Sequence, residues 1–102
     1  MNLERYEEAK ELLRKTIPVA RRVLGDNKDL TLRMRSLYAM TLYMDASATL
    51  DHLHEAVTTL EDAQRIARRV FGGAHPLVVQ MQDDLRNARA ALRARETPAS
   101  SA

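Results

Sequence analysis

The 102-residue chain is 45% hydrophobic and 29% charged, a balance that lets one small helical or mixed domain bury a core and keep a hydrated surface. It contains no cysteine, which excludes disulfides, thiolate nucleophiles and cysteine-ligated metals. A net charge of +2 does not indicate a nucleic-acid or membrane partner, and the polar N-terminus and short apolar runs predict a cytoplasmic protein with no membrane segment.

The first predicted helix covers about residues 2–25. Its apolar side chains recur at three- and four-residue steps, which is the period of one helical face. Gly25 ends this helix, because glycine readily takes the left-handed conformation found beyond a helix C-terminus. Pro18 lies inside the helix and lacks a backbone donor, so we expect a bend there. The apolar positions are Leu3, Tyr6, Ala9, Leu13, Ile17, Ala20 and Leu24.

Turn-like residues separate the next two predicted helices. The second helix covers about residues 30–45, and Asp29 is placed to cap its N-terminus. The third covers about residues 49–72, with Ser47 or Thr49 as its cap. Both segments therefore begin beside a short polar side chain that can accept a backbone hydrogen bond.

The fourth predicted helix covers about residues 76–95 and follows the glycine pair that ends the third. It opens at Pro76, because proline is favoured in the first turn of a helix, where a backbone donor would have no partner. Residues 96–102, "ETPASSA", show no apolar period and are predicted to form a disordered C-terminal tail. We therefore expect one helical domain over residues 1–95.

The chain repeats itself with an offset of 47 residues. "ARRVLG" at residues 20–25 returns as "ARRVFG" at residues 67–72, and the same offset pairs Glu8-Ala9 with Glu55-Ala56. Four antiparallel helices alone would fit either a closed bundle or stacked hairpins. A repeat period of 20 to 50 residues favours stacked hairpins, because it is typical of a solenoid.

The two copies resemble a known repeat. "YEEAKELLRKTIPVARRVLG" and "LHEAVTTLEDAQRIARRVFG" are similar to the second helix of a tetratricopeptide repeat of the kind found in kinesin light chains, and "GGAHPL" is similar to the Gly-x-x-His-Pro linker of that family. "LYAMTLY" resembles the Leu-Ala-x-x-Tyr centre of its first helix. The resemblance implies an all-α fold of antiparallel hairpins stacked as a short superhelix. It also implies a non-catalytic role in protein–protein interaction or scaffolding.

The two end helices differ from the family's interior helices. Arg86 of the fourth helix occupies the position of Ala39 in the second, so a bulky charge obstructs further packing and predicts a polar C-terminal cap. The first helix corresponds to the second helix of a hairpin that lacks its first. Leu12 and Val19 widen its apolar face, which predicts either a homo-oligomer or contact with preceding repeats of a longer protein.

Few residues offer catalytic or metal chemistry. His52 with Glu55, or Asp51 with His54, could supply half of a metal site on the third helix. A matching pair on a second helix is missing, so we interpret these residues as solvated side chains near a helix start and expect no metal or cofactor. There is no glycine-rich phosphate loop and no serine-centred elbow. We therefore predict that the protein is not an enzyme.

The family packing implies a concave surface lined by the first helix of each hairpin. Its mixed side chains suit an extended or helical peptide of a protein partner, although Met40 and Tyr43 could equally be ordinary packing between helices. The predicted peptide-binding residues are Arg33, Ser36, Met40, Tyr43, Gln80, Asp83 and Asn87.

The repeated arginine pairs have two interpretations. Arg21, Arg22, Arg68 and Arg69 lie in the last turns of their helices, where cations interact favourably with the helix dipole. Stacked side by side, they could instead form an anion ridge for an acidic peptide or RNA, which is the weakest of three functional hypotheses. The first is a non-catalytic peptide-binding module, and the second is a self-associating oligomerisation unit.

Overall fold

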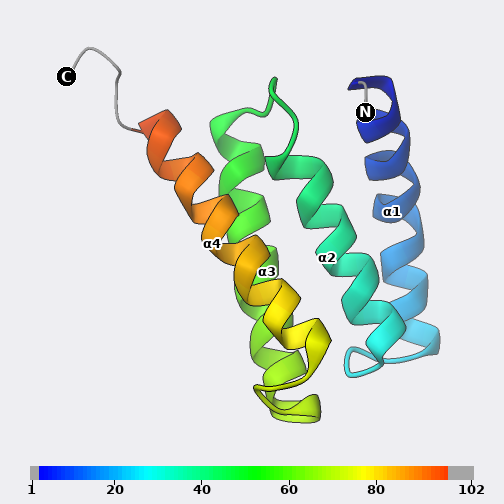
Figure 1. Ribbon diagram of the computed structural model, residues 1–102. Helices are drawn as coiled ribbons and strands as arrows, with labels where there is room; N and C mark the ends of the chain where they lie inside the picture. Colours follow the sequence, from blue (N-terminus) through cyan, green and yellow to red (C-terminus); the bar gives the residue numbers. More distant parts are fainter. Residues whose placement is uncertain (1–2, 97–102) are drawn as a thin grey trace.

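The computed structural model describes residues 3–96, which form four α-helices. They are α1 (Leu3–Val23), α2 (Asp29–Tyr43), α3 (Leu50–Phe71) and α4 (Pro76–Glu96). They follow one another across the molecule in chain order and alternate in direction (Figure 1). The predicted all-α fold is confirmed, because the helices pack sequentially as adjacent pairs, consistent with tetratricopeptide helical hairpins.

The packing pattern is that of a stack. Each helix packs on the next, and α2 also packs on α4, so that α2, α3 and α4 form a three-helix unit. Among the described helices, α1 packs on α2 alone. It therefore forms one end of the row in Figure 1.

The helix ends differ slightly from the predicted ranges. The first helix ends at Val23, and Gly25 follows with a positive φ of 95°, as its predicted role in the turn requires. The helix continues through Pro18. At the other end α4 extends to Glu96, one residue beyond its predicted end. The rest of the predicted tail, residues 97–102, lies outside the described residues.

One of the two predicted N-caps is correct. The prediction that Asp29 caps α2 is wrong: Lys28 is the capping residue and makes no side-chain cap bond. Asp29 is the first helical residue, and its carboxylate pairs with Arg33 Nε at 3.3 Å. Thr49 does cap α3, since its hydroxyl oxygen accepts from the backbone N–H of His52 at 3.1 Å. His52 Nδ1 accepts in return from the Thr49 backbone N–H at 3.5 Å and completes a capping box.

The core consists of two clusters that share α2, α3 and α4. One contains Leu32, Ala63, Ile66, Ala67, Leu77, Val78 and Met81. The other contains Tyr38, Ala39, Leu42, Ala56, Leu60, Leu85 and Ala88. Among the residues that the structure describes, helix α1 packs against the second cluster through the partly buried Leu13 and Ile17. The predicted small contact residues Ala39, Ala56 and Ala63 are fully buried, which lets the helices approach closely, whereas Ala9 of α1 is half-buried.

No helix within residues 3–96 has the length and apolar composition needed to cross a membrane.

Candidate functional site

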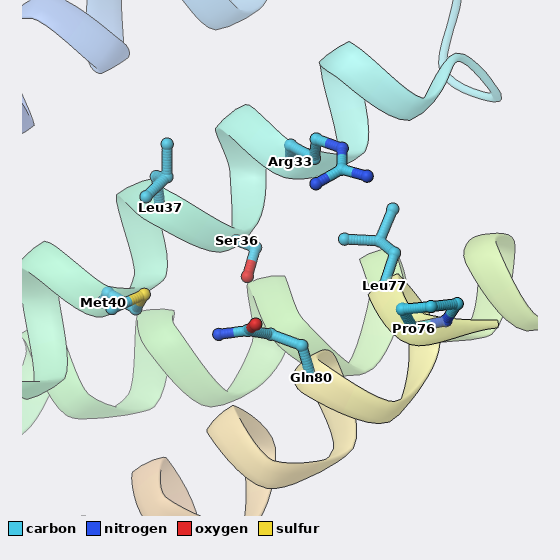
Figure 2. Close-up of a pocket in the computed structure, with 7 residues that line it drawn as sticks. All are labelled: Arg33, Ser36, Leu37, Met40, Pro76, Leu77 and Gln80. Carbon is cyan, nitrogen blue, oxygen red and sulfur yellow. The ribbon is translucent and has the colours of Figure 1, made fainter. Parts of the chain in front are cut away.

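A shallow groove of about 280 Å³ runs between α2 and the start of α4. Figure 2 shows its walls, with side chains of the two helices on opposite sides. It is lined by Arg33, Ser36, Leu37, Met40, Pro76, Leu77 and Gln80. Four of the predicted peptide-binding residues therefore lie together here, namely Arg33, Ser36, Met40 and Gln80.

The groove is apolar along most of its length and polar at a few points. Leu37 and Leu77 contribute aliphatic carbon and Met40 a flexible thioether, which adapts readily to a bound side chain. Ser36 and Gln80 point toward one another from opposite walls (Figure 2). Drug-sized ligands occupy pockets of roughly 300 to 1,000 Å³. The volume of this groove therefore suits one or two side chains of a longer peptide.

A buried carboxylate fixes the spacing of the two helices beside the groove. Asp84 on α4 is 6% exposed. It accepts hydrogen bonds from Ser36 Oγ at 3.3 Å and Tyr43 Oη at 2.9 Å. Burial, followed by the hydrogen bond to Asp84, raises the pKa of the Tyr43 phenol well above its ordinary value. Tyr43 is therefore a donor that joins α2 to α4, and it does not line the groove.

The sequence prediction missed Asp84. This residue lies at a position of α4 where the apolar period of Leu77, Met81 and Ala88 places it toward the core. A carboxylate in that register is a signal of a buried polar contact. The neighbouring Asp83, which was predicted instead, is exposed and pairs with Arg86 Nη1 at 3.2 Å.

The remaining predicted face residue, Asn87, is exposed and lies outside the groove lining. The groove is instead extended by three residues that the prediction did not include: Leu37, Pro76 and Leu77. Leu37 could have been found from its exposure on the same side of α2 as Arg33 and Met40, because these positions follow one another at three- and four-residue steps.

A second buried polar contact joins α2 to α3 and was also not predicted. Arg35 is buried on α2, and its Nη2 donates to Asp62 Oδ2 at 2.8 Å. This hydrogen bond lowers the pKa of the Asp62 carboxyl. Arg35 Nη1 is buried without a hydrogen-bond partner. The fold therefore depends on one carboxylate to satisfy a guanidinium in its interior.

The Tyr38 hydroxyl extends the polar contacts to α1. It donates to Glu55 Oε2 on α3 at 2.7 Å and accepts from Arg14 Nη2 on α1 at 3.3 Å. Burial and the bond to Glu55 raise the pKa of the Tyr38 phenol. Three helices therefore meet at a single side chain.

The arginine pairs occupy the last turns of α1 and α3, as expected. Arg21 Nε is 2.6 Å from Asp26 Oδ1 in the following turn, and this hydrogen bond lowers the pKa of the Asp26 carboxyl. Arg22, Arg68 and Arg69 are exposed. Helices α1 and α3 do not pack on each other, and the anion ridge stays a prediction.

The two predicted oligomer-face residues are exposed on α1. Leu12 is 66% exposed and Val19 is 46% exposed. Val23, which the prediction did not place on this face, is 71% exposed.

The three histidines have structural contacts. His75 Nδ1 accepts from the backbone N–H of Leu77 at 3.1 Å, and its ring stacks on Phe71 with centroids 4.7 Å apart. His54 Nε2 is 3.6 Å from Glu96 Oε2, and His52 belongs to the capping box. Among the side chains that the structure describes, no three histidine or carboxylate residues gather where they could hold a metal ion.

Comparison with protein families identifies residues 1–27 as matching the family described as tetratricopeptide repeat. The match covers α1 and the turn that follows it, which is the first of the two repeated segments. Comparison with the curated proteins and with the solved structures gave no match.

Proposed function

Because residues 1–27 are a tetratricopeptide repeat segment, we propose that the chain is a protein-interaction module that holds a peptide of its partner in the groove between α2 and α4. Repeats of this kind are generally protein–protein interaction modules and typically non-catalytic. On the same ground we infer that the chain is not an enzyme and that its partner is a protein. A cytoplasmic location stays a prediction.

The observation that carries the proposal is the composition of the groove. Its apolar walls contain exposed carbon from Leu37 and Met40 that a partner side chain would cover, with favourable transfer of apolar surface from water. Gln80 supplies an exposed amide that suits a peptide backbone, whereas the buried Ser36 hydroxyl donates to Asp84. Helix α2 is tied to α4 by Asp84, so the groove is preformed and a ligand avoids the cost of ordering it.

The charge of Arg33 determines the direction in which a bound peptide lies in the groove. Arg33 lines the groove near the first residues of α4, and within residues 3–96 its ion-pair partner is the exposed Asp29. An exposed ion pair of this kind contributes little, so Arg33 is available to a carboxylate of the ligand. We therefore expect a bound segment with an apolar side chain beside Met40 and an acidic group toward Arg33.

The affinity should be modest, because the groove is short. Contacts that bury little surface lie at the weak end of protein recognition, so we expect a Kd of about 10 to 100 μM for a single peptide. The test is to select peptides from a displayed library against the full chain and to measure the selected sequences by fluorescence anisotropy. Variants Leu37→Ala and Met40→Ala should each weaken binding about fivefold to thirtyfold, the range for losing a central apolar contact.

Leu50→Ala is the matched control, because Leu50 is an exposed leucine on α3 outside the groove. It should leave the Kd within about twofold. Selected peptides that bind the two groove variants as tightly as the wild type would contradict the proposal. Binding that weakens steeply with added salt, and on replacing Arg68 and Arg69, would favour the anion ridge instead.

A further inference from the structure

The outer face of α1 carries an unpartnered apolar stripe. Leu12, Val19 and Val23 follow one another at steps of seven and four residues, so they lie along one side of the helix. All three residues are exposed, by 66%, 46% and 71% respectively. The only described helix that packs on α1 is α2, which covers the side of Leu13 and Ile17.

The internal repeat shows what kind of element this face accepts. The offset of 47 residues pairs Val19 with Ile66 and Lys15 with Asp62. In α3 these two positions face α2: Ile66 packs in one cluster with Leu32, and Asp62 binds Arg35. Because α2 runs antiparallel to α3 (Figure 1), the matching face of α1 is shaped for an antiparallel helix.

The charges on α1 restrict which helix can dock. Where α3 offers Asp62 to an arginine of its partner, α1 offers Lys15, so a helix with an arginine at that position would be repelled. Helix α4 does not meet the requirement either, since it has Gln82 at the position of Arg35 and Arg86 at that of Ala39. A helix that brings acidic side chains toward the basic half of α1 is therefore favoured on this face.

Helix α1 itself meets this condition when a second copy docks antiparallel. Beside the stripe lies a row of exposed charges that is acidic in its first half, at Glu8 and Glu11, and basic in its second, at Lys15 and Arg22. Within the described residues Glu8, Lys15 and Arg22 form no hydrogen bond or ion pair, and the pair of Glu11 with Arg14 is long at 4.0 Å. An antiparallel copy of the row places acid opposite base at both ends, where Glu8 meets Arg22, and brings the two Lys15 side chains together at its centre. A parallel copy places like charges together along the whole row.

We propose that the face is occupied by α1 of a second copy of this chain, docked antiparallel about a two-fold axis between Lys15 and Thr16. In this register Leu12 of one copy packs on Val19 of the other, and Glu8 lies close to Arg22. Lys15 approaches its own counterpart, and Glu11 of each copy, one turn away, offsets that repulsion. The contact is isologous and closes as a dimer. It uses none of the residues that line the groove, so it stands apart from the proposed function.

Sedimentation velocity on the full chain tests the association. A single helix pair is a small interface, so the dimer should appear as the concentration rises from about 10 μM to about 1 mM. Val19→Ser should weaken it at least tenfold, and Val70→Ser is the matched control, because Val70 is similarly exposed on α3. Circular dichroism of both variants shows that a loss of dimer is not a loss of fold.

Charge exchange tests the partner's identity. Glu8→Lys alone and Arg22→Glu alone should each weaken the dimer, since each places like charges together across the interface. The double variant should restore it, because the pair is then reversed and intact. Restoration is not expected if these residues only affect the fold of one copy or contact a different protein.

Cysteine crosslinking tests the direction of the pair. The chain has no native cysteine, so single introduced thiols are unique. A mixture of Leu12→Cys and Val19→Cys chains should form disulfide dimers on mild oxidation, whereas each variant alone should not, because identical positions lie about 10 Å apart along the helices. Self-crosslinking of Leu12→Cys would overturn the antiparallel register. A strictly monomeric chain at about 1 mM would overturn the proposal and leave the face to a different helix.

Discussion

Removing the carboxylate of Asp62 should destabilise the fold far more than removing an exposed one. The Arg35 side chain is 9% exposed and that of Asp62 is 34% exposed, so Asp62→Ala leaves a buried cation without its partner. Breaking a fully buried pair costs about 3 to 5 kcal/mol, and losing a hydrogen bond to a charged group costs about 1.5 to 3 kcal/mol. Because water reaches one side of Asp62, we expect a loss of about 2 to 3 kcal/mol in the free energy of unfolding.

That loss is large for a domain of this size. Stability of about 0.05 to 0.15 kcal/mol per residue gives about 5 to 15 kcal/mol for the whole chain. A loss of about 2 to 3 kcal/mol should therefore lower Tm by about 10 to 20 °C. Urea titration followed by helical circular dichroism measures it, with Asp83→Ala as the matched control. Asp83 forms an exposed ion pair, and its loss should cost about 0.5 kcal/mol or less.

The double variant Arg35→Met with Asp62→Leu shows why Asp62→Ala is unstable. It distinguishes the cost of leaving the Arg35 charge without a partner from the cost of losing a packing contact. It should recover most of the stability lost in Asp62→Ala, because apolar residues of similar size replace buried ion pairs at little cost. The reasoning is refuted if Asp62→Ala matches Asp83→Ala, or if the double variant is as unstable as Asp62→Ala.

Three further predictions concern local features. Gly72 has a φ of 89° with open space around it, so Gly72→Ala should lower the free energy of unfolding by about 1 to 3 kcal/mol through backbone strain alone. Gly73→Ala is the control: its added methyl group would meet only the Arg68 side chain at 3.7 Å, so it should change the unfolding midpoint little. Thr49→Ala removes a cap of α3 and should cost about 1 kcal/mol in the same urea titration, and no loss would contradict the capping role. Arg35 lowers the pKa of Asp62 in the folded chain. This carboxylate therefore stabilises the fold above its unfolded pKa of about 4 and loses that contribution as the pH falls through the folded pKa. Asp62→Asn should flatten the decline of Tm below about pH 4, and parallel pH profiles of the variant and the wild type would contradict this.

The sequence predicts those features that depend on local chemistry. Four helices and their order follow from apolar spacing and from glycine and proline at the connections, because these act within one segment. The Thr49 cap has the same local origin. Four of the seven residues that line the groove belong to the predicted concave face, because the position of Ala39 indicates which side of α2 faces the neighbouring hairpin; that they bind a peptide stays a prediction.

The polar contacts between helices could not be predicted in the same way. Arg35 and Asp84 lie at positions that local patterning reserves for apolar residues, and each is stable there only because a partner arrives from another helix. Tyr43 was expected in the groove, but its hydroxyl turns to Asp84. The outcome depends on the packing angle and register of two helices, which periodicity within one helix does not specify.

The attachment of α1 to α2 alone has a consequence for how the molecule opens. In a stack whose stability is a sum of contacts between neighbouring helices, a helix at the end that packs on one neighbour has the fewest contacts to lose. Leu13, Ile17, the buried Ala20 and the Arg14 contact to Tyr38 contribute to holding α1 in place. Its amides should exchange with solvent through a local detachment, at a lower free energy than those of α2 to α4, which unfold together. Whatever covers the free side of α1 would then turn the weakest unit of the fold into part of its cooperative core.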